Sequence, residues 1–491
     1  MSGNKLLGWW LPLLVAAIPA VAFYTLALRS FYINGAWWGD AGILASVMWH
    51  SGWALHLPLV AGGRSFLATH MALVFWLTSG LSWVLPFTRV QFFALFLGAV
   101  QGLMALPVYT LLARLGVKPL IAAALAILFA CNGIVLAASC NLHFELLIVA
   151  SGMAFLAALA CGQPWLARLY LLLCLMTRED AGFHLALLLL AGSAGLRWQG
   201  VDWAKLRPLL GYAGFALCWS LTDLAAQHIW FPSGKALQGV YLGHPLFSGL
   251  TPVVLATRLT FWMLYRLYVI LPMAVALVLA ERWRTPLLWA GFASCLPWLG
   301  LNWLAASPYA GTLSDYYPFP LVFGLFWPLV GQIFAEQFQA PRLLSRRRAV
   351  GGFVVVLGAS FIGLWGMQNP QALRFPFVFF NPPSLAIQAE TDRAITKLAD
   401  ADLGRVAADG AVIALDPDHY TRSQLVWWPQ PEPPNTVIFF PSGQGTAHAL
   451  ALAKQAGLAQ FYEIPGTQLR IATDKPTALA ALLPRPWVPS Q

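Results

Sequence analysis

Five carboxylates set within a strongly apolar chain are the residues best suited to chemistry. The first 389 residues contain only nine acidic residues, and Asp40 is the only one among the first 144. The five that fall where an apolar segment meets the expected outer surface are Asp40, Glu145, Glu179, Asp180 and Asp315. A carboxylate beside a membrane-spanning segment is unfavourable unless it has a partner or a task, so these residues are candidates for a functional site.

Asp40 follows the first apolar segment, at the end of the tryptophan-rich stretch 37–40. Its carboxylate could act as a general base that accepts a proton from a substrate hydroxyl. Residues 41–56 have a spacing compatible with an amphipathic helix lying on the bilayer surface. Asp is also a favoured capping residue, so an N-cap for that helix is the alternative role for Asp40, and the two roles are compatible.

Two polar segments separate the later apolar runs. His143 and Glu145 stand two positions apart, so both side chains point to one side of an extended loop and could bind a divalent cation or hydrogen-bond a phosphate. A pair of solvated loop residues is the alternative. Arg178, Glu179 and Asp180 interrupt an apolar stretch, either as a solvated hairpin or as a self-neutralising cluster that positions a polar ligand.

Weaker candidates lie further along the chain. Asp315 and Tyr316 precede the mouth of a later apolar run, where a turn with interfacial tyrosines is the simpler interpretation. Asp223 and His228 lie in the outer part of another run and are secondary candidates.

Composition identifies a multi-span membrane protein. The chain is 59% hydrophobic and 10% charged, whereas soluble domains contain about 25% charged residues. The 29 Lys and Arg against 19 Asp and Glu give a net charge of +10. Much of this excess lies in short loops between apolar runs, which is the positive-inside pattern and does not indicate nucleic acid. The six cysteines have no spacing typical of a zinc site or a disulfide framework.

Apolar runs recur along the first three quarters of the chain, near 6–28, 67–86, 90–113, 119–138, 145–162, 165–177, 181–196, 208–230, 261–280, 286–304, 317–336 and 349–367. The first resembles an uncleaved signal anchor with a cytoplasmic N-terminus, and a signal peptide cleaved near the small residues 20–22 is the alternative. The basic loops at 114–118, 197–207, 281–284 and 342–348 should also face the cytoplasm. All these loops can face the cytoplasm only if residues 67–113 cross the membrane once. We therefore interpret 67–86 as a re-entrant or interfacial helix and 90–113 as the second span. The fold predicted is all-α and polytopic, with about eleven transmembrane helices and up to thirteen.

The composition changes after residue 367, and ten of the nineteen acids lie at or beyond Glu390. We predict a transmembrane domain at 1–367 and a small α/β domain on the outer, periplasmic side at 368–491. Residues 411–416 and 436–440 are predicted strands, and 446–456 a predicted helix. Asp416-Pro-Asp418 is read as a turn and not as a metal-binding motif.

The order of the polar motifs resembles that of a known family. Gly39-Asp40 is followed by Thr69-His70, by Asn-Leu-His-Phe-Glu at 141–145, by Arg-Glu-Asp-Ala-Gly at 178–182 and by Tyr317-Pro318. Together these resemble the predicted bacterial membrane proteins grouped as domain of unknown function 2079, relatives of the GT-C glycosyltransferases. The resemblance covers residues 1 to about 470, and the Glu-Asp-Ala-Gly block is its most specific element.

The resemblance implies a hexosyl or pentosyl transferase of the bacterial inner membrane. Such an enzyme would move a sugar from a polyprenyl-phosphate donor to a glycan, lipid or protein acceptor on the outer face. In GT-C enzymes an aspartate in the first outer loop serves as base, and Asp40 occupies the matching position. A second outer-loop acid helps bind a metal or the lipid phosphate, which points to Glu145 with His143 and to Mg²⁺ or Mn²⁺. Interfacial helices in the first outer loop are also implied.

The resulting hypothesis is an inverting transferase in which Asp40 deprotonates the acceptor. The residues expected to bind substrate are Arg64, His70, Arg178, Glu179, Asp180, Asp315 and Tyr316, with His143 as a further phosphate ligand. The chain departs from the family at two points, where Thr69 and Asn141 stand in place of acids. A transporter or flippase of lipid-linked or small polar substrates is the alternative, and a non-catalytic assembly protein is a third possibility.

Overall fold

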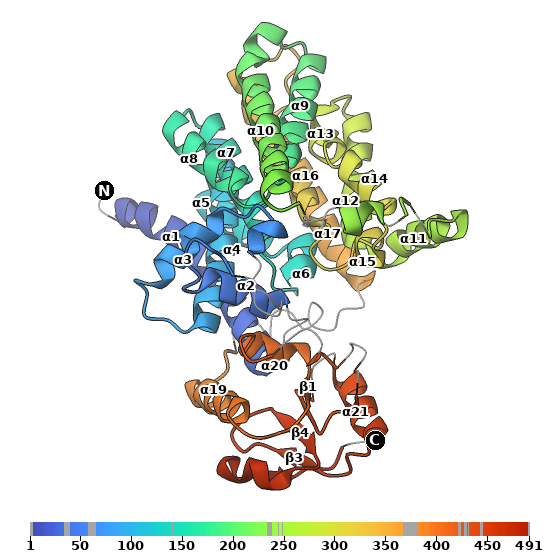
Figure 1. The fold of residues 1–491 in the computed structure, drawn as a ribbon. Coiled ribbons are helices and arrows are strands. Elements are labelled where there is room, and N and C mark those ends of the chain that lie inside the picture. Colours follow the sequence, from blue (N-terminus) through green and yellow to red (C-terminus); the bar gives the residue numbers. More distant parts are fainter. Residues whose placement is uncertain are drawn as a thin grey trace.

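The structure of the protein, a computed structural model, describes residues 3–33, 40–56, 65–139, 141–232, 238–243, 245–247, 249–366, 381–420, 424–426, 430, 432–441 and 445–489. Residues before 367 form a large assembly of helices, and the C-terminal residues form a smaller part with a sheet (Figure 1). The predicted boundary at 367/368 lies outside the described residues.

The first helices are α1 (Gly3–Tyr32), α2 (Asp40–Met48), η1 (Phe66–Ala68), α3 (Val74–Ser82), α4 (Arg89–Arg114), α5 (Pro119–Ala130), α6 (Gly133–Ser139), α7 (Leu146–Ala160), α8 (Pro164–Leu175), α9 (Ala181–Trp198) and α10 (Trp203–Trp230). The helices that follow are η2 (Gln238–Leu242), α11 (Pro252–Tyr265), α12 (Leu267–Arg282), α13 (Leu287–Ala293), α14 (Leu296–Trp303), α15 (Pro308–Gly311), η3 (Phe319–Leu321), α16 (Val322–Gln337), α17 (Arg346–Ile362) and η4 (Gly363–Gly366).

Five helices in the described ranges are long and apolar enough to cross a membrane: Trp10–Tyr32 of α1, α4, α9, α10, and Phe319–Gln337, which joins η3 to α16. The number rises to seven if two bent pairs each form one span, α5 with α6 (42°) and α11 with α12 (82°). Helices α7 and α8 have 15 and 12 residues, or about 22 and 18 Å at 1.5 Å per residue, short of a core of about 30 Å. Eleven crossings therefore stay a prediction.

The segment between α1 and α4, predicted to be the first outer loop, differs in part from its prediction. Within the run 67–86, α3 has only nine residues, about 14 Å, which is too short to cross a bilayer. Helix α2 also has nine residues and ends at Met48, so the helix predicted over 41–56 is too long. Six of its residues are buried, and the helix packs on α3, α4 and α20 of the C-terminal part. Protein therefore covers much of the apolar surface of α2, and its position on the bilayer stays a prediction.

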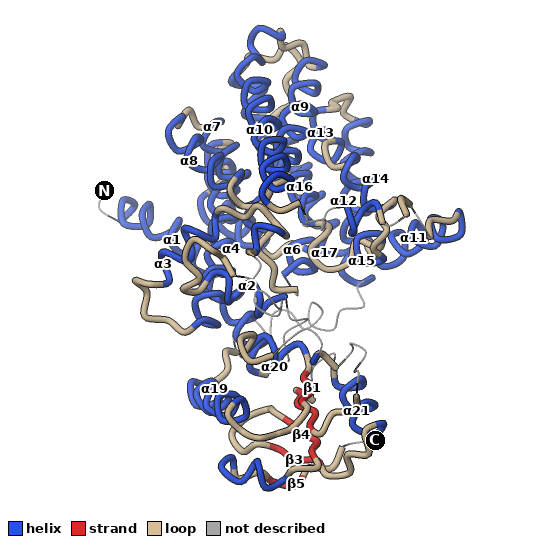
Figure 2. Tube along the Cα trace, viewed as in Figure 1, coloured by secondary structure: helices blue, strands red, loops and turns tan. Residues whose placement is uncertain are grey.

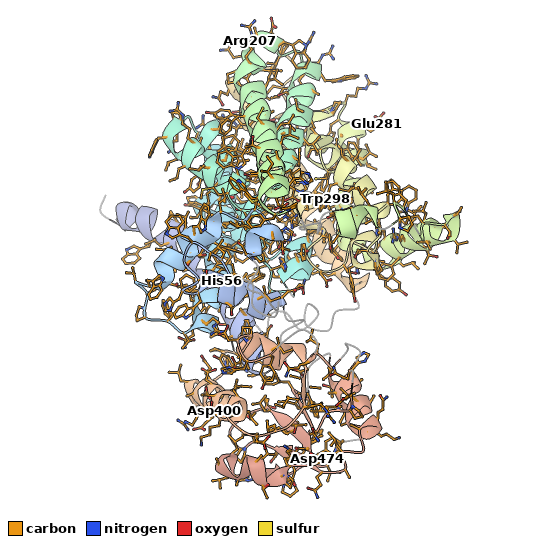
Figure 3. The ribbon with its side chains drawn as sticks, viewed as in Figure 1. His56, Arg207, Glu281, Trp298, Asp400 and Asp474 are labelled. Atoms are coloured by element: carbon orange, nitrogen blue, oxygen red, sulfur yellow. The ribbon has the colours of Figure 1, made fainter. Side chains whose placement is uncertain are left out.

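Small residues let the long helices pack closely. A Cβ on Gly98 of α4 would lie 2.4 Å from the carbonyl oxygen of Ala20 in α1, and a Cβ on Gly102 would lie 2.7 Å from that of Ala16. Glycines four residues apart are a common basis for close helix contact in membranes. Arg207 near the start of α10 and Glu281 near the end of α12 lie toward the end of the helical part that is remote from Asp400 and Asp474 (Figure 3).

The C-terminal part contains a five-stranded sheet of order β1-β2-β4-β3-β5 (Figure 2). Its elements are α19 (Leu385–Ala399), β1 (Val406–Ala408), α20 (Gly410–Leu415), β2 (Thr436–Phe439), α21 (Thr446–Gln455), β3 (Phe461–Glu463), β4 (Arg470–Thr473), η6 (Pro476–Leu482) and β5 (Arg485–Pro486). Strands β1 and β2 are parallel, and the other pairs are antiparallel.

The strand predicted at 436–440 and the helix predicted at 446–456 are confirmed, but 411–416 is helix α20 and not a strand. Its start is fixed by Asp409, which accepts a hydrogen bond from Val412 N at 3.0 Å. The predicted turn at Asp416–Asp418 is confirmed, with Asp418 paired to Arg89 at 2.6 Å.

The C-terminal part docks on the start of the helical part. Arg29 Nη1 donates to Asn381 O at 2.7 Å, and Tyr32 Oη donates to Asp392 Oδ2 at 3.2 Å. With the Arg89–Asp418 ion pair, these contacts fasten α1 and α4 to the C-terminal part.

Candidate functional site

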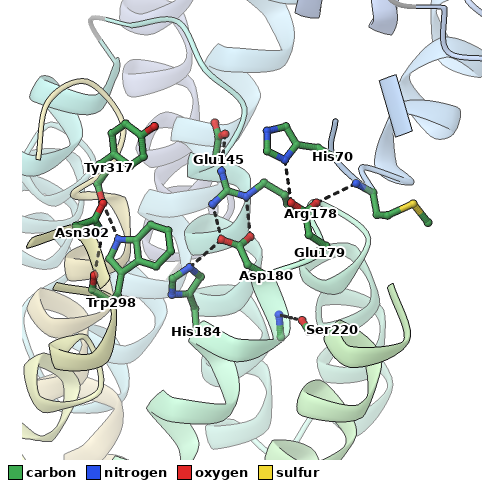
Figure 4. A network of polar contacts seen from close by, with 12 residues as sticks. His70, Glu145, Arg178, Glu179, Asp180, His184, Ser220, Trp298, Asn302 and Tyr317 are labelled. Carbon is green, nitrogen blue, oxygen red and sulfur yellow. Dashed lines mark hydrogen bonds and ion pairs between the residues drawn. The ribbon is translucent and has the colours of Figure 1, made fainter. Parts of the chain in front are cut away.

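Arg178 holds two carboxylates at the centre of a buried polar cluster (Figure 4). Its Nε and Nη2 donate to the two oxygens of Asp180 at 2.6 and 2.5 Å, and Nη1 donates to Glu145 Oε1 at 2.7 Å. The Arg178 side chain is 5% exposed, and the carboxylate residues are 10% and 0% exposed. The self-neutralising cluster is therefore confirmed, and the solvated hairpin is wrong.

The cluster lies where several helix ends meet. The turn between α8 and α9 contains Arg178–Asp180, and α7 begins directly after Glu145. Because α7, α8 and α9 are joined by short turns, the start of α7 and the α8–α9 turn fall at the same end of the assembly. Val74 N of α3 donates to Met176 O at 2.9 Å, which joins the first outer loop to this turn.

Gly182 allows α10 to approach the cluster. A Cβ on Gly182 would lie 2.0 Å from Ala216 O and 2.6 Å from Ser220 Oγ. Gly182 N instead donates to Ser220 Oγ at 2.9 Å. The last glycine of the Arg-Glu-Asp-Ala-Gly block is therefore required by close helix packing.

His143 completes the Glu145 side of the cluster. Its Nδ1 hydrogen-bonds Glu145 Oε2, and its ring stacks on Tyr316 with centroids 4.1 Å apart. The preceding Leu142 has φ +43°, a left-handed conformation that non-glycine residues adopt at a free-energy cost. Such strain clusters at functional sites, which suits a role for the 141–145 loop. The two side chains do face one another, and the solvated-loop alternative is wrong because both are buried.

Glu179 points the opposite way, toward the first outer loop. Its Oε1 accepts from His70 Nδ1 at 2.9 Å, and its Oε2 accepts from Met71 N at 2.9 Å. Burial by itself lowers the pKa of His70, but the Glu179 carboxylate outweighs burial and the pKa is raised. His70 is 21% exposed and stands at the edge of the cluster.

His184 belongs to the cluster and was not predicted. Its Nε2 lies 3.3 Å from Asp180 Oδ2, and its ring contacts Trp298 and Phe319 edge-on. The Arg178 guanidinium lies 5.5 Å from the Phe319 ring centre. The i, i+4 spacing of Asp180 and His184 on α9 was the one signal that the sequence offered.

Both carboxylates bound by Arg178 stay ionised. Burial raises the pKa of Glu145, but His143 and then Arg178 outweigh burial and hold the pKa below its ordinary value. For Asp180, burial is likewise outweighed by Arg178 and then His184, and the pKa is lowered. The pKa of Arg178 is raised in turn, mainly by Asp180 against the opposing effect of burial.

Asp315 and Asp40 border the cluster. Asp315 has φ +56°, and burial raises its pKa to about 6, with Arg266 and His143 lowering it and Asp40 raising it. Asp40 is therefore close enough for its charge to act on Asp315. Asp40 is exposed and is itself the first residue of α2, and its carboxylate has no hydrogen bond within the described residues. The N-cap alternative thus gains no support.

The pair predicted to bind a metal does not fit one in this arrangement. One oxygen of Glu145 is taken by His143 and the other by Arg178. Mg²⁺ and Mn²⁺ need several oxygen ligands. No group of three or more His, Cys, Asp or Glu side chains suited to a metal occurs in the ranges the structure describes. The predicted cation therefore has no support from His143 and Glu145.

The structure brings together most of the predicted residues. His70, His143, Glu145, Tyr316 and the Arg178–Asp180 triplet form one connected cluster, which Asp40 and Asp315 border. Arg64 lies outside the described residues. His228 is exposed on the outer surface of α10 and does not join the cluster.

Neither a protein-family model nor a curated protein matches the chain, so the resemblance to domain of unknown function 2079 stays a prediction. Among solved structures, the chain is similar to the archaeal oligosaccharyltransferase AglB from Archaeoglobus fulgidus, in complex with an inhibitory peptide and a dolichol-phosphate. The identity is 12%, the TM-score is 0.40, and the match covers 96% of this chain and 75% of that one. A TM-score this low does not decide the fold family.

Proposed function

We propose that the protein is a GT-C-type glycosyltransferase of the bacterial inner membrane, with a cytoplasmic N-terminus and a periplasmic C-terminal part. It would transfer a sugar from a polyprenyl-phosphate donor to an acceptor hydroxyl on a glycan, lipid or protein. The observation that carries the proposal is the buried Glu145–Arg178–Asp180 cluster at one end of apolar helices, bordered by Asp40 and Asp315. Ionisable residues beside membrane helices are functional candidates by default.

Asp40 is proposed as the general base. Its exposed carboxylate accepts the proton of the acceptor hydroxyl while the hydroxyl oxygen attacks the anomeric carbon. The bond from that carbon to the phosphate oxygen breaks, and polyprenyl phosphate leaves with the electron pair. A single displacement of this kind inverts the anomeric configuration.

His70 is proposed to stabilise the leaving phosphate. Glu179 holds its Nδ1, so Nε2 is oriented and the imidazolium form is favoured. A cation fixed where negative charge develops lowers the barrier more than a mobile one. Arg64, six residues earlier in the sequence, is the second proposed phosphate ligand.

Arg178 is proposed to organise the site and not to bind phosphate. All three of its nitrogen atoms already donate to Glu145 and Asp180, and the side chain is buried. A phosphate could reach the guanidinium only by displacing a carboxylate. Its proposed task is to keep the 141–145 loop and the α8–α9 turn in register, with His143 and Tyr316 as the surface that faces substrate.

The alternative function is transport or flipping of a lipid-linked or small polar substrate. One observation favours it, because α11 and α12 form a pair bent by 82°, and interrupted helices are typical of transporter binding sites. The two functions differ in whether a covalent product forms.

The test uses purified full-length protein in lipid nanodiscs with radiolabelled undecaprenyl-phosphate hexose and pentose, and an envelope extract as the source of acceptors. We expect labelled sugar to appear on a new product together with free undecaprenyl phosphate. Asp40→Asn should lower that rate about 10²–10⁴-fold without loss of thermal stability. Asp400→Asn, an exposed carboxylate of the C-terminal part, is the matched control.

If Asp40→Asn transfers sugar at the wild-type rate, Asp40 is not the general base. If the labelled lipid moves across proteoliposome membranes and no donor gives a covalent product, the protein is a transporter and not a transferase.

A further inference from the structure

Helices α8 and α10 border a groove that is separate from the polar cluster. The groove has a volume of about 530 Å³, within the range of about 300–1,000 Å³ that is typical of ligand sites. Its lining includes Arg168, Leu171 and Leu172 of α8 and Gly211, Tyr212 and Phe215 of α10.

The groove lies toward the ends of α8 and α10 that are remote from the cluster. Ser220 of α10 accepts from Gly182 N beside the cluster, and Gly211 lies nine residues earlier, about 14 Å back along the helix. Arg168 lies near the start of α8, whereas Arg178 follows the end of that helix. In the orientation proposed above, the groove is therefore in the cytoplasmic half of the membrane.

Two sequence signals fix the depth of the groove. The loop at 197–207 that leads into α10 is basic, as cytoplasmic loops are. Trp165, near the start of α8, is 72% exposed, and exposed tryptophans gather where the membrane meets water. Arg168 lies three residues later, about 5 Å along the helix, so its guanidinium can reach the level of the lipid head groups.

The lining is apolar except at two side chains. Arg168 is exposed and has no ion pair or hydrogen bond among the described residues. The Tyr212 ring packs edge-on against Phe155 with centroids 5.3 Å apart, and its hydroxyl has no hydrogen bond in the same ranges. Leu172 and Phe215 are 42% and 50% exposed, so the apolar walls face outward, toward the acyl chains of a bilayer.

This chemistry selects the ligand. Apolar walls that face the bilayer suit a hydrocarbon chain, and an unpaired arginine at head-group level suits a negative charge. No carboxylate is among the described residues that line the groove, so the charge of Arg168 is not neutralised there. Basic pockets between membrane helices on the cytoplasmic side are typical sites for anionic lipid head groups.

We propose that the groove binds an anionic phospholipid of the inner leaflet, with the head-group phosphate at Arg168 and an acyl chain between α8 and α10. The inference goes beyond the proposed function and takes from it only the orientation of the helices. The lipid would brace two helices that position the cluster, because α8 leads into the Arg178–Asp180 turn and α10 is bonded to Gly182.

Two glycines of α10 supply a matched pair of variants. Gly211 lines the groove, and a Cβ added there has nothing within 4 Å. Gly214 lies three residues later, is equally open and does not line the groove. A leucine at 211 therefore fills the groove, and a leucine at 214 does not.

The test measures lipid binding to purified full-length protein by native mass spectrometry. The probes are dioleoyl phosphatidylglycerol, which is anionic, and dioleoyl phosphatidylcholine, which has the same chains and no net charge. We expect wild type to bind the anionic lipid more tightly. Arg168→Gln should weaken that binding about 10-fold and leave phosphatidylcholine unchanged. Arg282→Gln, which removes an exposed arginine at the end of α12, should change neither.

The glycine variants test the groove itself. Gly211→Leu should weaken binding of both lipids, because both need the space for a chain, and Gly214→Leu should weaken neither. Phosphatidylglycerol should also raise the melting temperature of wild type and of Gly214→Leu more than that of Gly211→Leu. Without lipid both leucine variants should melt no lower than wild type, since the two positions are exposed and leucine is a better helix former than glycine.

Four results would overturn the inference. They are equal binding of the two lipids by wild type, equal weakening of both lipids by Arg168→Gln, equal effects of Arg168→Gln and Arg282→Gln, and full binding by Gly211→Leu. Displacement of phosphatidylglycerol by undecaprenyl phosphate in wild type, but not in Arg168→Gln, would assign the groove to the donor lipid and would also overturn it. None of these results concerns Asp40, so the transferase proposal is tested separately.

Discussion

Gly42 and Ala414 meet across almost the whole length of the chain. A Cβ on Gly42 would lie 2.4 Å from Ala414 Cα and 2.9 Å from Ala414 O. Helix α2, which begins at Asp40, therefore rests directly on the backbone of α20 in the C-terminal part. The proposed base and the C-terminal part are thus mechanically joined.

Gly42→Ala should loosen this contact. Because the clash is with backbone, a flexible side chain cannot relieve it, and overpacking of this kind costs about 1–3 kcal/mol. We expect a lower melting temperature and faster hydrogen exchange in α2 and α20. Gly80→Ala in α3 is the control, since nothing lies within 4 Å of its added methyl group. Equal behaviour of the two variants would mean that the contact does not hold the parts together.

Arg178→Leu should be strongly destabilising. Removal of the guanidinium leaves Glu145 and Asp180 buried with one partner fewer each, and breaking a buried ion pair costs about 3–5 kcal/mol. Arg178→Lys should recover only part of the loss, because an ammonium cannot pair with both oxygens of Asp180 and with Glu145 at once. Thermal unfolding in detergent measures both.

The control for Arg178 is Arg393→Leu, which removes an exposed pair with Glu390 at 2.6 Å and should cost at most about 1 kcal/mol. If the two leucine variants lose the same stability, the buried cluster has no special role in the fold.

Gly182→Ala should displace α10 from the site. The added methyl group would stand 2.0 Å from Ala216 O, which neither helix can absorb without moving. Transfer activity and stability should both fall, the latter by about 1–3 kcal/mol. Gly214→Ala on α10 has nothing within 4 Å and should be neutral or slightly stabilising. A cross-link between cysteines introduced on α9 and α10 would report the displacement directly.

Asp315 should make stability depend on pH. Burial raises its pKa to about 6 from an ordinary 3.8, so the folded state binds more protons than the unfolded state between these values. Its stabilising contribution is full below about pH 4 and is lost as the pH rises through about 6. The shift corresponds to about 3 kcal/mol at most. Asp315→Asn should therefore be more stable than wild type at pH 7 and should show a flatter curve from pH 4 to 8.

The Asp40→Asn variant tests the pKa of Asp315 in a second way. Loss of the neighbouring negative charge should lower the pKa of Asp315 and move the decline in stability to lower pH. An unchanged profile in Asp40→Asn would indicate that the two carboxylates do not interact.

Local sequence patterns identified much of this molecule. Apolar runs predicted the helices, and the spacing of His143 and Glu145 predicted that both side chains lie on one side of a loop, because such short-range geometry depends on few backbone angles. The prediction of a strand at 411–416 was wrong because local sequence was ambiguous there. A short apolar run does not distinguish a strand from a buried helix, and the capping bond from Asp409 determined the outcome.

The sequence alone determined that acids are scarce, that they gather at the ends of apolar runs and that their order resembles a GT-C pattern. Tertiary structure decided which of them touch. Arg178 joins Glu145, 33 positions away, and Glu179 reaches His70 across 109 positions. Such contacts depend on how helices such as α7, α8, α9 and α10 pack. The need for glycine at position 182 is likewise visible only in the fold, because it arises from the Ala216 carbonyl oxygen that would clash with a Cβ.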